Sequence, residues 1–235
     1  MFGGFTDKPR ILRGAFVEYG LSIPPLFVVF QFNPESLTRN RSLSYSASAP
    51  GSTRDKGSAE SLRDFHKRYD DLTQLRDEQF VTVQEEVISF QIRLDTSEKL
   101  DQFDPITGLF GIAPQLSTLE LMVHPKDESL FGQALGSLLG SPGGFSFTSK
   151  PNPPLILFIW GRKRVLPVNI NSLNITELFY SPDLDPIRAT VDVNLTVIEG
   201  KNMPYLGTKA IKETLAALNL ANINIIDIAN VVIPG

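Results

Sequence analysis

The chain has 235 residues, a hydrophobic content of 42%, a charged content of 20% and a formal net charge of -4. This length fits one β-rich domain with decorations or two small domains, and this composition is typical of a folded protein rather than a disordered one. The acidic balance argues against nucleic acid as a partner, because nucleic-acid affinity depends on neutralising phosphates. Cysteine is absent, which excludes disulfides, thiolate zinc sites and cysteine nucleophiles.

Residues 1–14 do not resemble a secretory signal, because charged residues such as Asp7 and Arg10 interrupt them. The longest apolar run, residues 21–32, contains two prolines and is too short to cross a bilayer of about 30 Å as a helix. We therefore expect a soluble protein that is made in the cytoplasm and does not insert directly into a membrane.

The first predicted elements are strands. Residues 11–19 and 26–32 are rich in Val, Phe and Leu, and a glycine and a proline pair between them indicate a turn. Residues 37–45 predict a weaker, partly exposed strand, in which Arg39 and Arg41 alternate with neighbouring polar positions.

The next segment changes character. Residues 46–60 have almost no large apolar side chain, so they predict a flexible loop or an arm. In residues 61–76, apolar side chains recur at spacings of three and four, which favours a short amphipathic helix. These apolar positions are Leu62, Phe65, Tyr69 and Leu72.

A strand and two short helices are predicted in the middle of the chain. Residues 87–95 alternate between apolar and polar side chains, which is typical of a half-buried strand. Pro114 suits the first turn of a helix, so we expect a helix at 114–123. A second short helix at 131–139 and a loop rich in Gly, Ser and Pro follow.

The clearest strands begin at residue 155. Residues 155–160 predict a compact apolar strand, residues 161–164 a basic hairpin turn, and residues 165–180 a second strand. The apolar residues change parity within this second strand. A bulge or bend near Ser172 would keep them all directed at one core.

Residues 187–197 predict the best strand, because they alternate strictly over eleven positions. One side is apolar, and the other has no large apolar residue, which predicts contact with water. The polar side consists of Arg188, Thr190, Asp192, Asn194 and Thr196.

The C-terminal segment predicts a helix followed by an apolar tail. Residues 208–220 have apolar positions at helical spacing, with Thr208 as an N-cap. We expect the tail to residue 235 to be buried, either against the chain's own sheet or against a neighbouring subunit.

The residues that could carry chemistry form no catalytic or metal-binding pattern in the sequence. His66 and His124 lie far apart, without metal-ligand spacing. Asp183 and Asp185 could act as an acid and base pair, but their flanking prolines favour turn formation. The glycines within 136–144 match neither a nucleophile elbow nor a phosphate loop. Trp160 is interpreted as a core residue rather than a sugar-stacking platform.

The basic turn carries Arg162, Lys163 and Arg164, and three interpretations of it stay open. These cations could grip a phosphate or carboxylate, they could be solvated, or they could meet an acidic patch on a partner subunit. We take them as candidate subunit contacts.

Five stretches of the chain, in this order, resemble the tube-like domain of contractile injection system proteins and related phage tails. The resemblance covers roughly residues 10–200, and its most specific part is the last stretch, with its proline-flanked acidic turn before a long alternating strand. The stretches are FQFNPESL (30–37), ISFQIRLD (88–95), GIAPQLSTLELMVHP (111–125), PPLILFIWG (153–161) and VLPVNINSLNITELFYSPDLDPIRATVDVNLTVIE (165–199).

In that family the domain is a β-barrel or sandwich that forms six-fold rings beneath the inner tube, on a three-fold spike hub. The resemblance therefore implies a mainly β fold with a few short helices. It also implies a homo-oligomeric ring that contacts the spike hub, inner tube proteins and baseplate components, without catalysis or a cofactor. The ring would be assembled into a contractile particle from protein made in the bacterial cytoplasm.

We expect a tube-like β domain over residues 1–200, with a flexible loop or arm at about 46–78, and a C-terminal helix and tail over 201–235. No LysM module, which many hub adaptors carry, is found in the last segment, so a short adaptor is the first interpretation and an inner tube protein the second. The polar face of 187–197 would line the ring's lumen. A ligand-binding β-sandwich and a hydrolase with scattered carboxylates are the alternatives from other classes.

Overall fold

The structure is a computed structural model, which describes residues 12–20, 25–47, 61–96, 105–124 and 152–221. Its strands are β1 (Ala15–Glu18), β2 (Phe27–Val29), β3 (Leu37–Asn40), β4 (Leu43–Ser46), β5 (Phe80–Val83), β6 (Val87–Asp95), β7 (Ile156–Ile159), β8 (Val165–Tyr180) and β9 (Pro186–Val197). Its helices are α1 (Leu62–His66), α2 (Leu72–Glu78), α4 (Pro105–Phe110), α5 (Ala113–Leu121) and α7 (Met203–Ala221). The predictions for most of the loop at 46–60, for residues 131–144 and for the tail after 221 lie outside the described residues.

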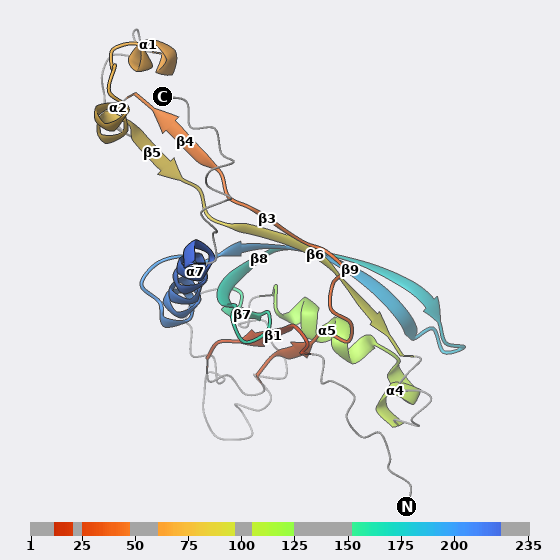
Figure 1. The fold of residues 1–235 in the computed structure, drawn as a ribbon. Coiled ribbons are helices and arrows are strands. Elements are labelled where there is room, and N and C mark those ends of the chain that lie inside the picture. The colour runs from red at the N-terminus through yellow and green to blue at the C-terminus, as the bar shows by residue number, and fades with distance from the viewer. Residues whose placement is uncertain (1–11, 21–24, 48–60, 97–104, 125–151, 222–235) are drawn as a thin grey trace, which may run out of the picture.

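The chain is mainly β with a few helices, as the sequence predicted. Seven strands form one antiparallel sheet in the order β2-β1-β7-β8-β9-β6-β3, and β4 and β5 form a separate two-stranded ribbon. Figure 1 shows this ribbon projecting from the body, with α1 and α2 at its far end. We call β4, β5, α1 and α2 together the arm.

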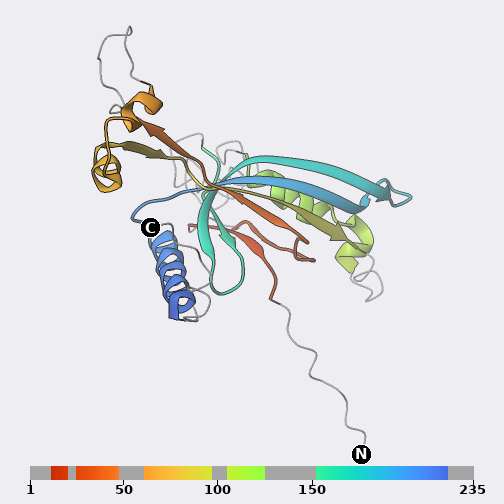
Figure 2. The ribbon, with the colours of Figure 1, turned by 45° about the horizontal axis from the view of Figure 1, so that its top comes forward.

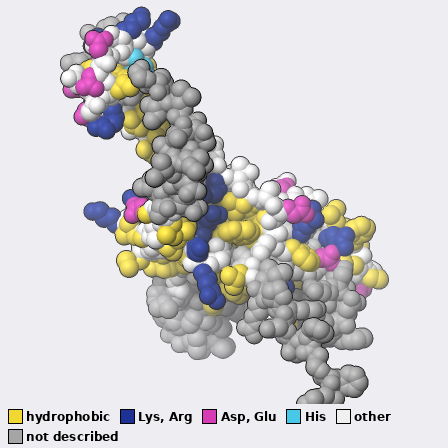
Figure 3. Space-filling view, in the orientation of Figure 1, with side chains coloured by type: hydrophobic (Ala, Val, Ile, Leu, Met, Phe, Trp, Pro, Cys, Tyr) yellow, Lys and Arg dark blue, Asp and Glu magenta, His cyan; other side chains and the backbone are white. Residues whose placement is uncertain are grey.

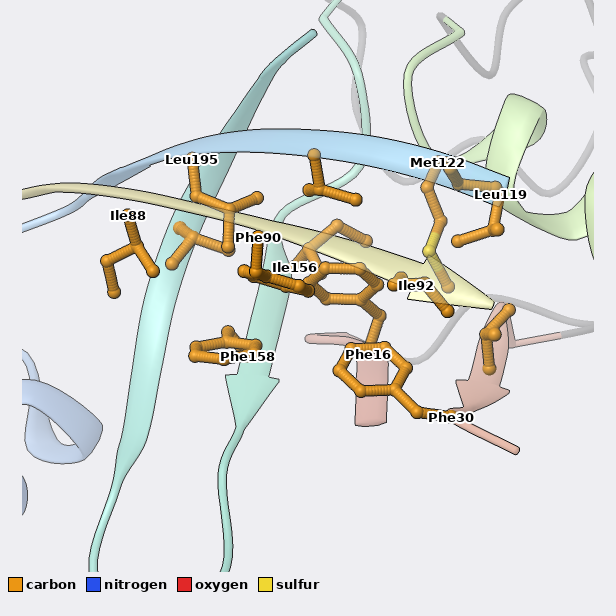
Figure 4. Packing of buried hydrophobic residues seen from close by; sticks show 14 of the residues in the cluster. Phe16, Phe30, Ile88, Phe90, Ile92, Leu119, Met122, Ile156, Phe158 and Leu195 are labelled. Atoms are coloured by element: carbon orange, nitrogen blue, oxygen red, sulfur yellow. The ribbon is translucent and has the colours of Figure 1, made fainter. Parts of the chain in front are cut away.

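The large sheet curls over its own apolar face. Four strands separate β2 from β6 in the sheet order, yet the ring of Phe30, just after β2, lies 5.7 Å from that of Phe90 in β6. Phe16 and Phe158 complete the aromatic centre of the core, in contacts such as the edge-to-face pair of Phe16 and Phe30 (Figure 4). The curl therefore brings both ends of the sheet to one hydrophobic interior.

Helix α5 closes part of this interior, and its position confirms the helix predicted at 114–123. Leu116, Leu119 and Met122 are buried in the same cluster as the phenylalanines. Figure 4 shows Leu119 and Met122 in this cluster. Pro114 lies in the first turn, where a missing N–H costs least. Gly111, which precedes α5, has a φ of 56° and lets Ile112 N donate a hydrogen bond of 2.9 Å to the carbonyl oxygen of Pro186.

The arm corrects two predictions. The strand predicted at 37–45 is two strands, because the chain leaves the large sheet after β3, which pairs with β6, and enters the ribbon as β4, which pairs with β5. The helix predicted at 61–76 is also two, since Asp71 accepts a 2.8 Å hydrogen bond from Thr73 N and so caps α2 anew. The spacing of apolar residues, on which the prediction was based, does not reveal this second N-cap.

The long hairpin of β8 and β9 confirms the parity change predicted near Ser172. Ile170 pairs with Leu195 and Ser172 with Asn194, so Asn171 is the extra residue of a bulge. As a result, Ile170 and Leu173 both pack toward the core. Figure 2 shows the hairpin continuing outward beyond the part of the sheet that curls.

Helix α7 begins earlier than predicted and lies against β8. Asn202 is its N-cap, because its Oδ1 accepts a 2.9 Å hydrogen bond from Tyr205 N. The prediction that Thr208 is the N-cap is wrong. Its buried hydroxyl instead donates to Val165 O at 2.7 Å and accepts from Val165 N at 3.0 Å, which satisfies the backbone where β8 starts. Among the described helices, none is long and apolar enough to span a membrane.

Candidate functional site

The polar face of β9 is the first candidate surface. The five residues predicted to face water alternate with buried apolar residues along β9 and are exposed or half-buried. They are Arg188, Thr190, Asp192, Asn194 and Thr196. The alternation follows from the period of two in a strand, since the opposite side chains of β9 form the core.

Hydrogen bonds between side chains cross this face from strand to strand. Asp192 accepts from Gln91 Nε2 of β6 at 2.8 Å, and Asn194 donates to Ser89 Oγ of β6 at 2.9 Å. On the other side, the bulge residue Asn171 donates to Asn194 Oδ1 at 2.7 Å and to Thr196 Oγ1 at 2.8 Å. The face is therefore an ordered polar surface spanning β6, β9 and β8, and sequence reasoning found only its β9 strip.

Charges on this face are largely paired. Arg188 bonds Asp95 through Nε at 2.7 Å, and its guanidinium lies 5.5 Å from the centre of the Phe179 ring. Arg93 lies 3.2 Å from a carboxylate oxygen of Glu35. Exposed pairs of this kind contribute little to stability. Their effect is to leave the face hydrated and close to neutral.

An open groove of about 650 Å³ runs along one end of this face. Its polar lining includes Arg93, Asp95, Arg188 and Gln91, and its apolar lining includes Phe32 and Leu178. The groove can accept a small polar molecule or a segment of a partner chain. In the part of the chain that the structure describes, no group of three His, Asp or Glu side chains is placed to hold a metal ion.

The basic turn is the second candidate surface, and its three cations differ in exposure. Gly161 has a φ of 67°, and Trp160 N donates to Arg164 O at 2.8 Å, which closes the turn. Arg162 and Lys163 are exposed at its tip. Arg164 is half-buried, and burial, with the nearby charge of Arg39, lowers the pKa of its guanidinium.

A charge cluster that sequence reasoning missed lies where the arm meets the body. At its centre is Glu86, whose side chain is 2% exposed and pairs with Arg39, Arg41 and Lys212. Arg41 also pairs with Glu199. We call these residues the root cluster, with Arg164 as its sixth member: Glu86, Glu199, Arg39, Arg41, Lys212 and Arg164.

The root cluster holds Glu86 in its charged form. Burial alone would raise the pKa of this carboxyl, but the hydrogen bond from Arg39 and the charge of Lys212 outweigh it and lower the pKa to about 2. The pair of arginines two residues apart, at 39 and 41, was the one local signal for the cluster. Its carboxylate partners are 45 or more residues away in the sequence.

The arm presents an exposed apolar face. The strand register places Leu43 opposite Val83 and Tyr45 opposite Val81, so all four side chains lie on one side of the ribbon. Each is 45–53% exposed. A two-stranded ribbon is marginal alone in water, and an apolar face of this kind is typical of a contact surface.

The tip of the β8–β9 hairpin is ordered by Ser181. Its hydroxyl accepts hydrogen bonds from Asp183 N at 3.2 Å and Asp185 N at 3.1 Å, so the turn is held by serine rather than by the two carboxylates. Phe179 and Leu184, both with positive φ, are 67% and 77% exposed. The tip therefore presents two large apolar side chains beside acidic ones.

The other candidate residues are two histidines and the sole tryptophan. His66, in α1, is within 3.0 Å of Gln79 Nε2, and His124 lies after α5 with its Nδ1 2.7 Å from Glu120 O. Trp160 packs on Phe158, with ring centres 6.0 Å apart, at the edge of the core. Comparison with protein-family models found no match to this chain, and comparison with curated proteins found none either.

Proposed function

We propose that the protein is a structural, non-enzymatic subunit of a ring in the baseplate of a contractile injection system, where it adapts the spike hub to the inner tube. The observation that carries this proposal is the sheet of β6, β9 and β8. One face packs into the core, and the other is ordered, hydrated and nearly neutral. A wall of this kind can line a channel without adhering to what passes through it.

Two further features support an assembly role. The apolar face of the arm and the hairpin tip are both exposed, although each carries large apolar side chains. Exposed clusters of large apolar side chains are typical of surfaces that become buried against other chains. The partners would be further copies of the chain in a six-fold ring, the hub on one side and tube proteins on the other. This assignment rests on the resemblance over roughly residues 10–200.

The test is cryo-electron microscopy of the purified full chain, alone and mixed with the hub protein of the same particle. We expect closed rings in which Arg188, Asp192 and Asn194 point into the lumen. A ring in which these side chains are buried between sheets would refute the lumen assignment. A stable monomer that binds a small ligand in the groove beside Arg188 would support a ligand-binding module instead.

A further inference from the structure

Among the described residues, those where the arm meets the body carry more positive than negative charges. The root cluster holds four cations against two carboxylates, and the adjoining turn adds Arg162 and Lys163, both exposed. The side chains of Arg39, Arg41 and Lys212 remain 35–39% exposed although they pair with Glu86. Figure 3 shows Lys and Arg side chains gathered at this position. We call the six cations together the root patch.

The hairpin tip carries charge of the opposite sign. Glu177, Asp183 and Asp185 are close in sequence to the exposed Phe179 and Leu184, and within the described residues no cation pairs with these three carboxylates. Arg188, whose guanidinium lies 5.5 Å from the centre of the Phe179 ring, pairs instead with Asp95. The hydrogen bonds to Ser181 hold the turn in one conformation, so binding would order few additional groups.

The two patches lie at opposite ends of one strand. The basic turn directly precedes β8 and the tip follows it, and β8 has 16 residues, which corresponds to about 50 Å of extended chain. Figures 1 and 2 both show the tip at one extremity of the molecule and α7, which carries Lys212, on the other side. A single chain therefore cannot bring its own tip to its own root patch.

We infer that the hairpin tip of one copy of this chain docks on the root patch of the next copy. Because the two surfaces differ, the contact is head-to-tail, and repetition of a head-to-tail contact closes into a ring when the rotation permits. Complementary charge selects this arrangement and disfavours tip-to-tip and root-to-root contacts. The inference rests on the proposed ring function and names the contact between neighbouring subunits.

Because the chain has no cysteine, single-cysteine variants test the contact directly. The variants D183C and K163C of the full chain are mixed in equal amounts and oxidised, and the disulfide-linked dimers are counted by mass. We expect the mixed dimer to exceed either self-linked dimer by about tenfold. The control mixture of K163C with S117C, at an exposed position in α5, should give only random pairing.

Charge reversal provides a second measurement. We expect R162E/K163E and D183K/D185K each to reduce the oligomer to monomer in sedimentation velocity, and the four substitutions together in one chain to restore it. The control E120K, at an exposed position in α5, should leave the oligomer unchanged. The altered side chains are exposed, except that of Asp185, which is half-buried. Circular dichroism checks that each variant is folded.

The outcomes separate this contact from the proposed function. An oligomer that forms without an excess of the mixed dimer, and that tolerates both reversals, would overturn the tip-to-root contact and leave the ring proposal standing. A wild-type chain that stays monomeric at every concentration and with its hub protein would overturn both.

Discussion

At the scale of single residues, Glu86 shows how a charge can be buried at a junction. Its carboxylate receives Arg39 from β3, Arg41 from the connection to β4, and Lys212 from α7. Two segments that are far apart in the sequence, residues 39–41 and α7, therefore meet on this one side chain. A buried carboxylate is stable only when it is paired and hydrogen-bonded in this way.

We expect E86Q to lower the free energy of unfolding by about 3 kcal/mol at pH 7, the value that corresponds to a pKa lowered from 4.5 to about 2. A lowered folded-state pKa gives stability that is complete above the unfolded-state pKa and is lost as the pH falls through the folded-state one. The wild type should therefore lose stability between about pH 5 and pH 2, and E86Q should lose less. Urea denaturation across this range measures both effects.

The matched control is E85Q, which makes the same change at the adjacent, exposed residue. We expect it to alter stability by less than about 0.5 kcal/mol. Equal losses for the two variants would contradict the role given to the root cluster.

Gly111 gives a second prediction at this scale. A Cβ at this position would lie 2.2 Å from the carbonyl oxygen of Pro186, and its φ of 56° disfavours other residues. We expect G111A to destabilise the protein by about 3 kcal/mol in thermal or urea denaturation. Gly108 in α4 has open space around it, so G108A should be neutral or stabilising by up to about 1 kcal/mol. A neutral G111A would show that α5 does not approach β9 this closely.

At the scale of elements, the bulge in β8 lets the apolar residues before it and after it face the same core, although they differ in parity. If Asn171 is deleted, the apolar residues Ile170, Leu173 and Ile175 fall at every second position of β8. The strand then keeps these three side chains on the face toward the core. We expect deletion of Asn171 to lower the free energy of unfolding by only about 2 kcal/mol, because the variant loses two hydrogen bonds to β9. The fluorescence of Trp160, the sole tryptophan, reports unfolding in urea.

Deletion of Thr190 is the contrasting variant. This deletion changes the register of β9 by one residue, so the apolar residues on the two sides of position 190 can no longer share one face. Either the residues before position 190 or the buried residues after it, such as Val191 and Leu195, then face water. We expect this variant not to fold, because several buried side chains at about 2 kcal/mol each exceed the stability of a typical domain. Similar losses for the two deletions would mean that the bulge does not set the inward face of β8.

At the scale of the whole molecule, the curled sheet forms a body from which the arm and the β8–β9 hairpin both project (Figure 1). The body buries the aromatic centre of Phe16, Phe30, Phe90 and Phe158, whereas the two projections expose apolar side chains such as Tyr45 and Leu184. This division places the stable core and the surfaces available for contact in different parts of one chain. It is the arrangement expected of a subunit that completes its packing in an assembly.

The sequence by itself determined the elements whose signal is local. Strict alternation predicted β6 and β9 and the polar side of β9, and a parity change predicted the bulge in β8, because a strand's inward and outward faces follow from its own residues. Only the tertiary structure decided the contacts between distant segments. The contact of Phe30 with Phe90 and the root cluster around Glu86 depend on how far the sheet curls and on where α7 lies. The hydrogen bonds of Thr208 to β8 depend on the position of α7 as well. No short stretch of sequence carries that information.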